Sequence, residues 1–348
     1  NEPSRILSMH QERAKRPSQK SSTGSLMKSS AHKRLTSILG QARYSIKERL
    51  GIAVYTRDAA YRVTGAVTFK NQEDRTCAGR VIIPIPQSIA YQKIVEPIKW
   101  EGSQVQIARD TQFGNEFAYA DFSLDAHRQI TWRFSCVVKV SPRSVSLSRA
   151  GTLAQYAGTP KDGFASQDPK VKARATALRG SEIQCRHILR QFNEYVIRSL
   201  RYGNPQRGLY SASDALSLPE VDCGGFDSLF CALCIASGIP GRIVSGFWPG
   251  TDADTAMHAW CEVCLPDGSW VPADPSIEHL VRAGRDRTKS GHLGYVGSDR
   301  VVFSVGSNIP IELEGGTATT VDLLQHPTAV VREGPTPQLS FDLSIIQQ

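Results

Sequence analysis

The sequence predicts an α+β protein in which a β-sandwich precedes a domain of helices and a β-hairpin. Its 348 residues are enough for two domains, since one hydrophobic core usually serves roughly 100 to 200 residues. Three patterns carry the prediction: a period of two from residue 52, a helical period at 180–200, and a short apolar helix followed by a hairpin at 222–276. Each pattern indicates one part of the fold.

The β-sandwich is predicted from alternation and turn residues. Apolar side chains alternate with polar ones at Tyr61, Val63, Gly65, Val67 and Phe69. Further β-rich runs cover 80–85, 117–122 and 130–140. Several short strands with turn residues between them are typical of a sandwich of about 90 residues.

The rest of the chain divides by composition. We expect a basic flexible arm at 1–50, the sandwich at 51–142, a connector at 143–178, and a second domain at 179–348 that ends in strands. The helix at 180–200 is predicted because apolar residues recur at helical spacing. They are Ile183, Ile188, Phe192, Tyr195, Val196 and Leu200, with His187 on the same side.

The net charge of +8 belongs to the arm. Residues 1–50 hold 11 Lys or Arg and three acids, and residues 51–348 hold 30 of each sign. The balanced remainder excludes an electrostatic case for nucleic-acid binding. An amphipathic basic helix is predicted at 33–50, and it either packs on its own protein or docks on an anionic membrane surface or a partner.

No membrane span is expected, because no stretch approaches the ~18 to 20 consecutive apolar residues that one needs. The beginning of the chain also lacks the apolar core of a secretory signal. A cytoplasmic or a periplasmic location, and any oligomeric state, stay open.

Cys223 opens the stretch that carries chemistry. It precedes two glycines and an apolar helix from about Phe226 to Ala236, ended by Gly238. A Cys at a helix N-terminus lies beside free backbone N–H groups and the positive end of the dipole, which favour thiolate over thiol. The same amides can hold the oxyanion of a tetrahedral intermediate.

A predicted hairpin supplies the partners of this cysteine. If Pro266, Asp267 and Gly268 form its loop, reflection about Asp267 puts Ser276 opposite His258. Asp274 is then the diagonal neighbour of His258 on the same face, and such pairs lie ~7 to 8 Å apart at the backbone. A nucleophile at a helix start, a base on one strand and an orienting acid on the next form a Cys, His, Asp constellation.

These motifs together resemble the transglutaminase-like superfamily. Its core has a Cys opening a helix, a GIPAR-like helix exit, a HAW-like strand and a W-V-P-x-D-like strand; here they read Cys223, Gly238 to Arg242, His258 to Trp260, and Trp270 to Asp274. The segments VIIPIPQSIAYQ at 81–92, FGNEFAYA at 113–120 and GYVGSDRVVFSVG at 294–306 are similar to a bacterial subgroup of putative cysteine proteases with an N-terminal β domain.

The resemblance implies a papain-like α+β core behind the sandwich, and an enzyme. Cys223 would form a thioester with an amide or peptide carbonyl, His258 would move the thiol proton, and Asp274 would fix the imidazole tautomer. We expect a cysteine-dependent protease or amidase acting on a peptide or protein substrate without cofactor or metal. The alternatives are transglutaminase-type acyl transfer to an amine, or a noncatalytic binding module with the same fold.

Four features depart from these patterns or leave choices open. Many relatives carry an acid shortly after the nucleophile, whereas this chain has Gly224, Gly225 and then Asp227, which would oppose a thiolate at Cys223. Two CxxC pairs, Cys231 with Cys234 and Cys261 with Cys264, are rejected as a zinc site because one lies in a helix and the other on opposite strand faces. Asp252 and Asp254 are too few ligands for calcium. Candidates for the second oxyanion donor are Tyr202, Asn204 and Tyr210.

Overall fold

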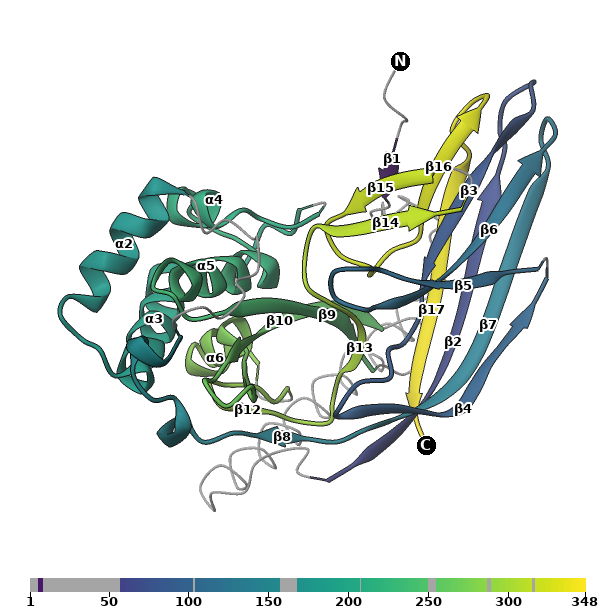
Figure 1. The fold of residues 1–348 in the computed structure, drawn as a ribbon. Coiled ribbons are helices and arrows are strands. Elements are labelled where there is room, and N and C mark those ends of the chain that lie inside the picture. Colours follow the sequence, from purple (N-terminus) through teal and green to yellow (C-terminus); the bar gives the residue numbers. More distant parts are fainter. Residues whose placement is uncertain are drawn as a thin grey trace, which may run out of the picture.

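The computed structural model describes residues 6–8, 57–102, 104–156, 168–206, 208–249, 255–286, 289–314 and 317–348. The basic helix predicted at 33–50 and the acids Asp252 and Asp254 lie outside these residues. The predicted α+β class is confirmed: helices gather at one end of the molecule and long strands at the other (Figure 1).

Two sheets form what we call the two-sheet region, on the right of Figure 1. One has the order β17-β2-β7-β4, with β17 at Gln338–Gln347, β2 at Ala59–Lys70, β7 at Gln129–Val140 and β4 at Gln92–Glu101. The other has the order β1-β16-β3-β6-β5, with β1 at Ile6–Ser8, β16 at Thr328–Glu333, β3 at Cys77–Pro84, β6 at Glu116–Leu124 and β5 at Gln106–Arg109. Their inner faces share one apolar core, because the buried Val63 and Trp132 cluster with Val81 and Ala118.

Both termini of the chain contribute to these sheets, which the sequence division did not predict. The C-terminal strands were expected to belong to the domain at 179–348, yet β17 pairs antiparallel with β2 and β16 pairs with β3. Three residues of the predicted arm, Ile6–Ser8, pair with β16. These partners lie hundreds of residues apart in the sequence, so no local pattern reports them.

The helical end is built around one central helix. Its elements are α2 at Pro169–Arg179, α3 at Cys185–Ser199, α4 at Ala212–Ser217, α5 at Cys223–Ala236 and α6 at Pro275–Arg282. Nearly every side chain of α5 is buried, and they form one core cluster with neighbouring helices and strands. α2 lies inside the predicted connector; only Val171 and Ala175 of this helix are buried, so it has almost no apolar periodicity to predict it.

A four-stranded sheet joins the two ends of the molecule. Its order is β11-β10-β9-β13, with β11 at Trp270–Ala273, β10 at Ala256–Cys264, β9 at Gly241–Trp248 and β13 at Val301–Val305. The smaller pairs are β8 at Arg143–Ser144 with β12 at Tyr295–Val296, and β14 at Ile309–Leu313 with β15 at Thr317–Val321. Short 3-10 helices cover Leu147–Arg149 and Leu153–Tyr156.

Side-chain amides of the two-sheet region hydrogen-bond to the backbone groups along the edge of β13 that pairs with no strand of its own sheet. The Gln92 amide donates to the carbonyl of Val302 and accepts from its N–H, both at 2.8 Å. The Asn115 amide does the same for Val305, at 2.8 and 2.7 Å. An unpaired strand edge exposes backbone groups that must find partners. The three sequence signatures at 81–92, 113–120 and 294–306 therefore meet at this strand.

Candidate active site

Cys223 is the first residue of α5, and the sequence explains why the helix begins there. The Asp222 side chain accepts from the N–H of Gly225 at 3.3 Å, which is a standard N-cap contact. Gly225 is required for close approach, since a Cβ there would lie 2.5 Å from Cβ of Val221. The partly exposed Cys223 therefore sits at a fixed position, with its thiol interacting with the backbone N–H of Ala259 on β10.

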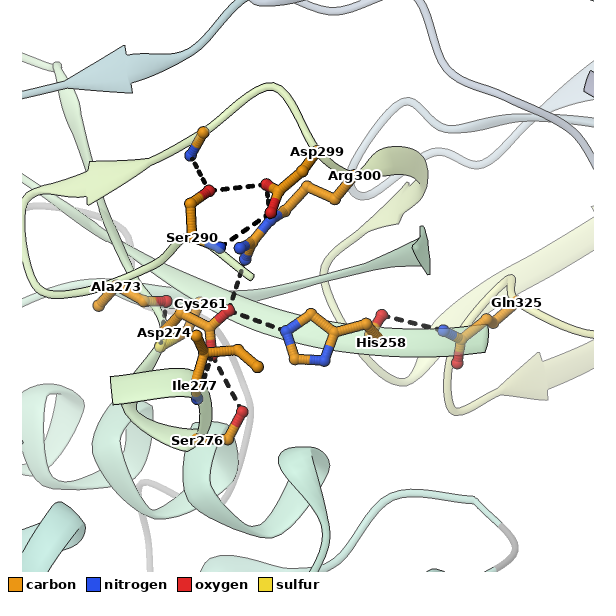
Figure 2. Close-up of polar contacts among 11 residues, drawn as sticks. His258, Cys261, Ala273, Asp274, Ser276, Ile277, Ser290, Asp299, Arg300 and Gln325 are labelled. Atoms are coloured by element: carbon orange, nitrogen blue, oxygen red, sulfur yellow. Dashed lines mark hydrogen bonds and ion pairs between the residues drawn. The ribbon is translucent and has the colours of Figure 1, made fainter. Parts of the chain in front are cut away.

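His258 comes from β10 and Asp274 from the residue after β11. The strands pair with Cys261 opposite Ala273 and Cys264 opposite Trp270, which confirms the predicted reflection about Asp267 for the paired residues, although Ser276 lies in α6 and not on a strand opposite His258. His258 and Asp274 are 2% and 0% exposed, and Nε2 of the imidazole lies 2.8 Å from Oδ2 of the carboxylate (Figure 2). The Asp274 carboxylate is the acceptor, so Nε2 carries the proton.

Both oxygens of the Asp274 carboxylate accept hydrogen bonds. Its Oδ1 accepts from the hydroxyl of Ser276 at 2.9 Å and from the N–H of Ile277 at 3.0 Å, so it also caps α6. Its Oδ2 accepts from His258 and from the guanidinium of Arg300, as Figure 2 shows. A Cβ at Gly291 would lie 2.8 Å from Cβ of Asp274, so the loop there has no room for a side chain.

Arg300 is the main feature of the site that the sequence did not reveal. The side chain is 1% exposed and lies between the carboxylates of Asp274 and Asp299. Its guanidinium stacks 4.3 Å from the ring of Trp248, whose ring centroid is 4.5 Å from that of His258. Arg300 lies within the 294–306 signature, but that signature did not indicate its role, because only the fold brings it to Asp274 from 26 residues away along the chain.

The side chain of Gln325 binds the backbone of His258. The Gln325 amide donates to the His258 carbonyl at 3.0 Å and to the Gly246 carbonyl at 2.6 Å, as the right of Figure 2 shows for His258. Gln325 is buried. It fixes the end of β10 against β9, and sequence reasoning did not single it out.

The electrostatics of the site favour a neutral resting pair. Burial raises the pKa of the Cys223 thiol, and Asp222 and Asp227 add to this rise, while the Ala259 amide opposes it. Burial lowers the pKa of His258, against the opposing effect of Asp274. Burial and the nearby acids therefore oppose the thiolate expected from the helix N-terminus, while the Ala259 amide favours it.

Asp274 shows the opposite behaviour. Burial alone would raise the pKa of its carboxyl, but the charges of His258 and Arg300 outweigh burial and hold that pKa below its usual range. Asp274 is therefore an anion at neutral pH, flanked by one permanent cation and one imidazole.

Of the three oxyanion-donor candidates, the structure brings one to the thiol. Asn204 and Tyr210 bind each other, since the Tyr210 hydroxyl donates to the Asn204 carbonyl at 2.6 Å. The Tyr202 hydroxyl instead interacts with the thiol of Cys223, and burial, followed by the charge of Cys223, raises the pKa of Tyr202.

One cavity among the described residues lies next to β10 without including the three predicted site residues. It has a volume of about 910 Å³ and is lined by Phe134, Phe247, Met257 and Phe341 among others, while Cys223, His258 and Asp274 do not line it. The described part of the chain holds no cluster of three metal-ligating side chains. None of its helices is long and apolar enough to cross a membrane.

Comparison with known proteins supports the resemblance. Residues 169–275 match the transglutaminase-like superfamily, which confirms the predicted family resemblance for this stretch. The structure is similar to that of a protein named a putative cysteine protease from Cytophaga hutchinsonii, at 14% identity and a TM-score of 0.53, covering 83% of this chain and 98% of that one. The periplasmic domain of TgpA from Pseudomonas aeruginosa matches at 15% identity and a TM-score of 0.32, covering 66% and 91%. No curated protein matches the sequence.

Proposed function

We propose that this protein is a cysteine-dependent hydrolase of amide or peptide bonds, with Cys223 as nucleophile, His258 as base and Asp274 as the group that orients the imidazole. The observation that carries the proposal is the buried hydrogen bond of 2.8 Å between His258 and Asp274. His258 is followed in the chain by Ala259, whose backbone amide interacts with the Cys223 thiol. A transglutaminase-like core supports the same chemistry.

The proposed reaction begins from the neutral pair. Because Nε2 of His258 donates to Asp274, Nδ1 is the basic nitrogen. Sγ of Cys223 attacks the substrate carbonyl carbon while its proton passes to Nδ1, so nucleophile activation and attack are coupled. The imidazolium that results is stabilised by the adjacent Asp274 carboxylate.

The oxyanion that forms needs hydrogen-bond donors. The N–H of Cys223, the first residue of α5, has no intrahelical partner by helix geometry, and the Tyr202 hydroxyl lies beside the thiol. Both can donate to the developing negative charge. The amine leaves with the proton from His258, and water then cleaves the thioester with His258 again as base.

The test is mass spectrometry of the protein after incubation with a mixed peptide library, with Cys223→Ala as the control. The proposal predicts an acyl adduct on Cys223 that is lost in water over time. An adduct that persists until an amine is added would favour transglutaminase-type acyl transfer instead, because both reactions share the first half.

A noncatalytic binding module is the second candidate, favoured by the acid Asp227 beneath the nucleophile. Intact-mass measurement of iodoacetamide modification separates the two functions. The hydrolase predicts modification of Cys223 that slows in His258→Ala, whereas equal and slow modification of both proteins would favour the binding module.

A further inference from the structure

Asp227 is a buried acid that the proposed reaction does not use. It lies in α5 one turn after Cys223, is 0% exposed, and neither carboxyl oxygen accepts from an N–H or O–H group; the weak thiol donor of Cys261 interacts with it. Residues four apart on a helix are surface neighbours, with Cβ atoms about 5 to 6 Å apart. A carboxylate without partners is very costly to bury, so such a group normally keeps its proton.

The groups around Asp227 reinforce this argument. The thiol of Cys261 faces it from β10, the carboxylate of Asp274 follows β11, and Asp222 begins α5. Burial and then the charge of Asp274 raise the pKa of Asp227 well above its usual range. The positive charge of Arg300 opposes this effect, but Arg300 is already paired with Asp274 and Asp299.

We propose that Asp227 is a positioning residue that the fold holds in its protonated form, and that its charge state controls the formation of thiolate at Cys223. This inference rests on the proposed role of Cys223 as nucleophile. While Asp227 keeps its proton, the layer beneath the thiol is neutral and the sulfur can take negative charge. Loss of the proton places a second negative charge one helical turn away and opposes that step.

Two consequences distinguish a proton-holding acid from a merely structural one. Asp has a pKa of about 3.9 in an unfolded chain, so unfolding above that pH releases the proton. A group whose pKa is raised on folding contributes stability below its unfolded pKa and loses it as pH rises toward its folded pKa. The folding equilibrium constant of the wild type should therefore fall about tenfold per pH unit relative to Asp227→Asn above about pH 4.

The second consequence concerns reactivity. Buried carboxyls lose their proton as late as about pH 8 to 9. Below that range, wild type and Asp227→Asn should be alkylated at Cys223 at rates within about twofold. Above it, only the wild type gains the second charge, and a like charge at this distance shifts a pKa by about one unit or more. The variant should then react about tenfold faster than the wild type near pH 9.5.

The experiment combines urea denaturation from pH 4 to pH 9 with iodoacetamide rates at Cys223 over the same range and up to pH 9.5. Asp342→Asn, the same change at an exposed position on β17, is the matched control and should follow the wild type in both. Asp227→Ala also removes the charge and serves as the second variant if Asn disturbs folding.

The outcomes are separable. Parallel stability curves for wild type and Asp227→Asn would overturn the protonated state. If the stability curves of wild type and Asp227→Asn differ but their alkylation profiles are identical, only the proposed effect of Asp227 on Cys223 is overturned. Absence of alkylation in both folded proteins at every pH would overturn the proposed nucleophile, and with it the coupling, while the stability curves still decide whether Asp227 holds a proton.

Discussion

Replacing Arg300 by methionine tests how the site shares one carboxylate between two partners. In the structure Arg300 and His258 both bind Oδ2 of Asp274, and all three side chains are at least 98% buried. Methionine has similar length without charge, so it removes the cation and preserves much of the volume. His258 then no longer shares Oδ2 of Asp274 with the guanidinium of Arg300.

Two changes follow from this geometry. The positive charge of Arg300 lowers the pKa of His258, so its removal should raise that pKa. The Asp274 carboxylate loses its permanent counter-ion, and breaking a buried pair by removing one partner costs about 3 to 5 kcal/mol. We expect about 3 kcal/mol, because His258 remains as a partner. For a chain of 348 residues this corresponds to roughly 4 °C in Tm, because the entropy of unfolding is about 2.1 cal/mol/K per residue.

The stability loss should also depend on pH. The folded-state pKa of Asp274 is depressed, so its contribution to stability is present above the unfolded value of about 3.9 and is lost as pH falls. The difference between wild type and Arg300→Met should therefore be largest near neutral pH and shrink in acid.

Two measurements check this reasoning: thermal unfolding from pH 3 to pH 7, and NMR titration of the His258 imidazole, assigned with His258→Gln. Arg62→Met is the matched control, since Arg62 and Glu96 form an ion pair at 3.4 Å that is about half exposed, and exposed pairs contribute at most about 1 kcal/mol. A Tm loss in Arg300→Met no larger than in Arg62→Met, or an unshifted His258 titration, would refute it.

Three further predictions follow from the packing around the site. Asp222→Ala removes the N-cap of α5 and should cost about 1 kcal/mol in urea denaturation, yet speed alkylation of the thiol because Asp222 raises its pKa; slower alkylation would contradict this. Gly225→Ala forces a Cβ to within 2.5 Å of Val221 and should cost about 1 to 3 kcal/mol, with an unchanged Tm as the contrary result. Glu262→Gln weakens a buried pair with Arg242 at 2.6 Å and should lower the free energy of unfolding by about 3 kcal/mol at pH 7. Because the pKa of Glu262 is lowered in the fold, this loss of stability should become smaller toward pH 4. A loss of stability that is constant with pH would contradict the prediction.

Local patterns were sufficient to predict the parts of the site that lie close together in the sequence. The hairpin loop at 266–268 fixes the register of β10 and β11, and that register brings Asp274 to His258. The apolar run after Cys223 is long enough for a buried helix and is preceded by a capping acid. Each of these features depends on fewer than 20 consecutive residues, so a local sequence pattern is enough to predict it.

The features that were missed all depend on distant residues or on small differences in energy. The pairing of β17 with β2 and the approach of Arg300 to Asp274 come from tertiary packing. The protonation state of Cys223 was predicted from the backbone N–H groups and the helix dipole, with Asp227 opposing them, whereas the burial of the thiol was not foreseen. A single sequence shows that a cysteine begins a helix, but it does not show how deeply the fold will bury it.

The charges around the nucleophile explain why proton transfer, and not a preformed ion pair, should activate Cys223. Burial disfavours both ionised partners, since it raises the pKa of the thiol and lowers the pKa of His258. Arg300 neutralises part of the Asp274 charge that would otherwise favour imidazolium. In the proposed reaction, negative charge develops on the substrate oxygen beside Tyr202 as the proton of Cys223 passes to His258.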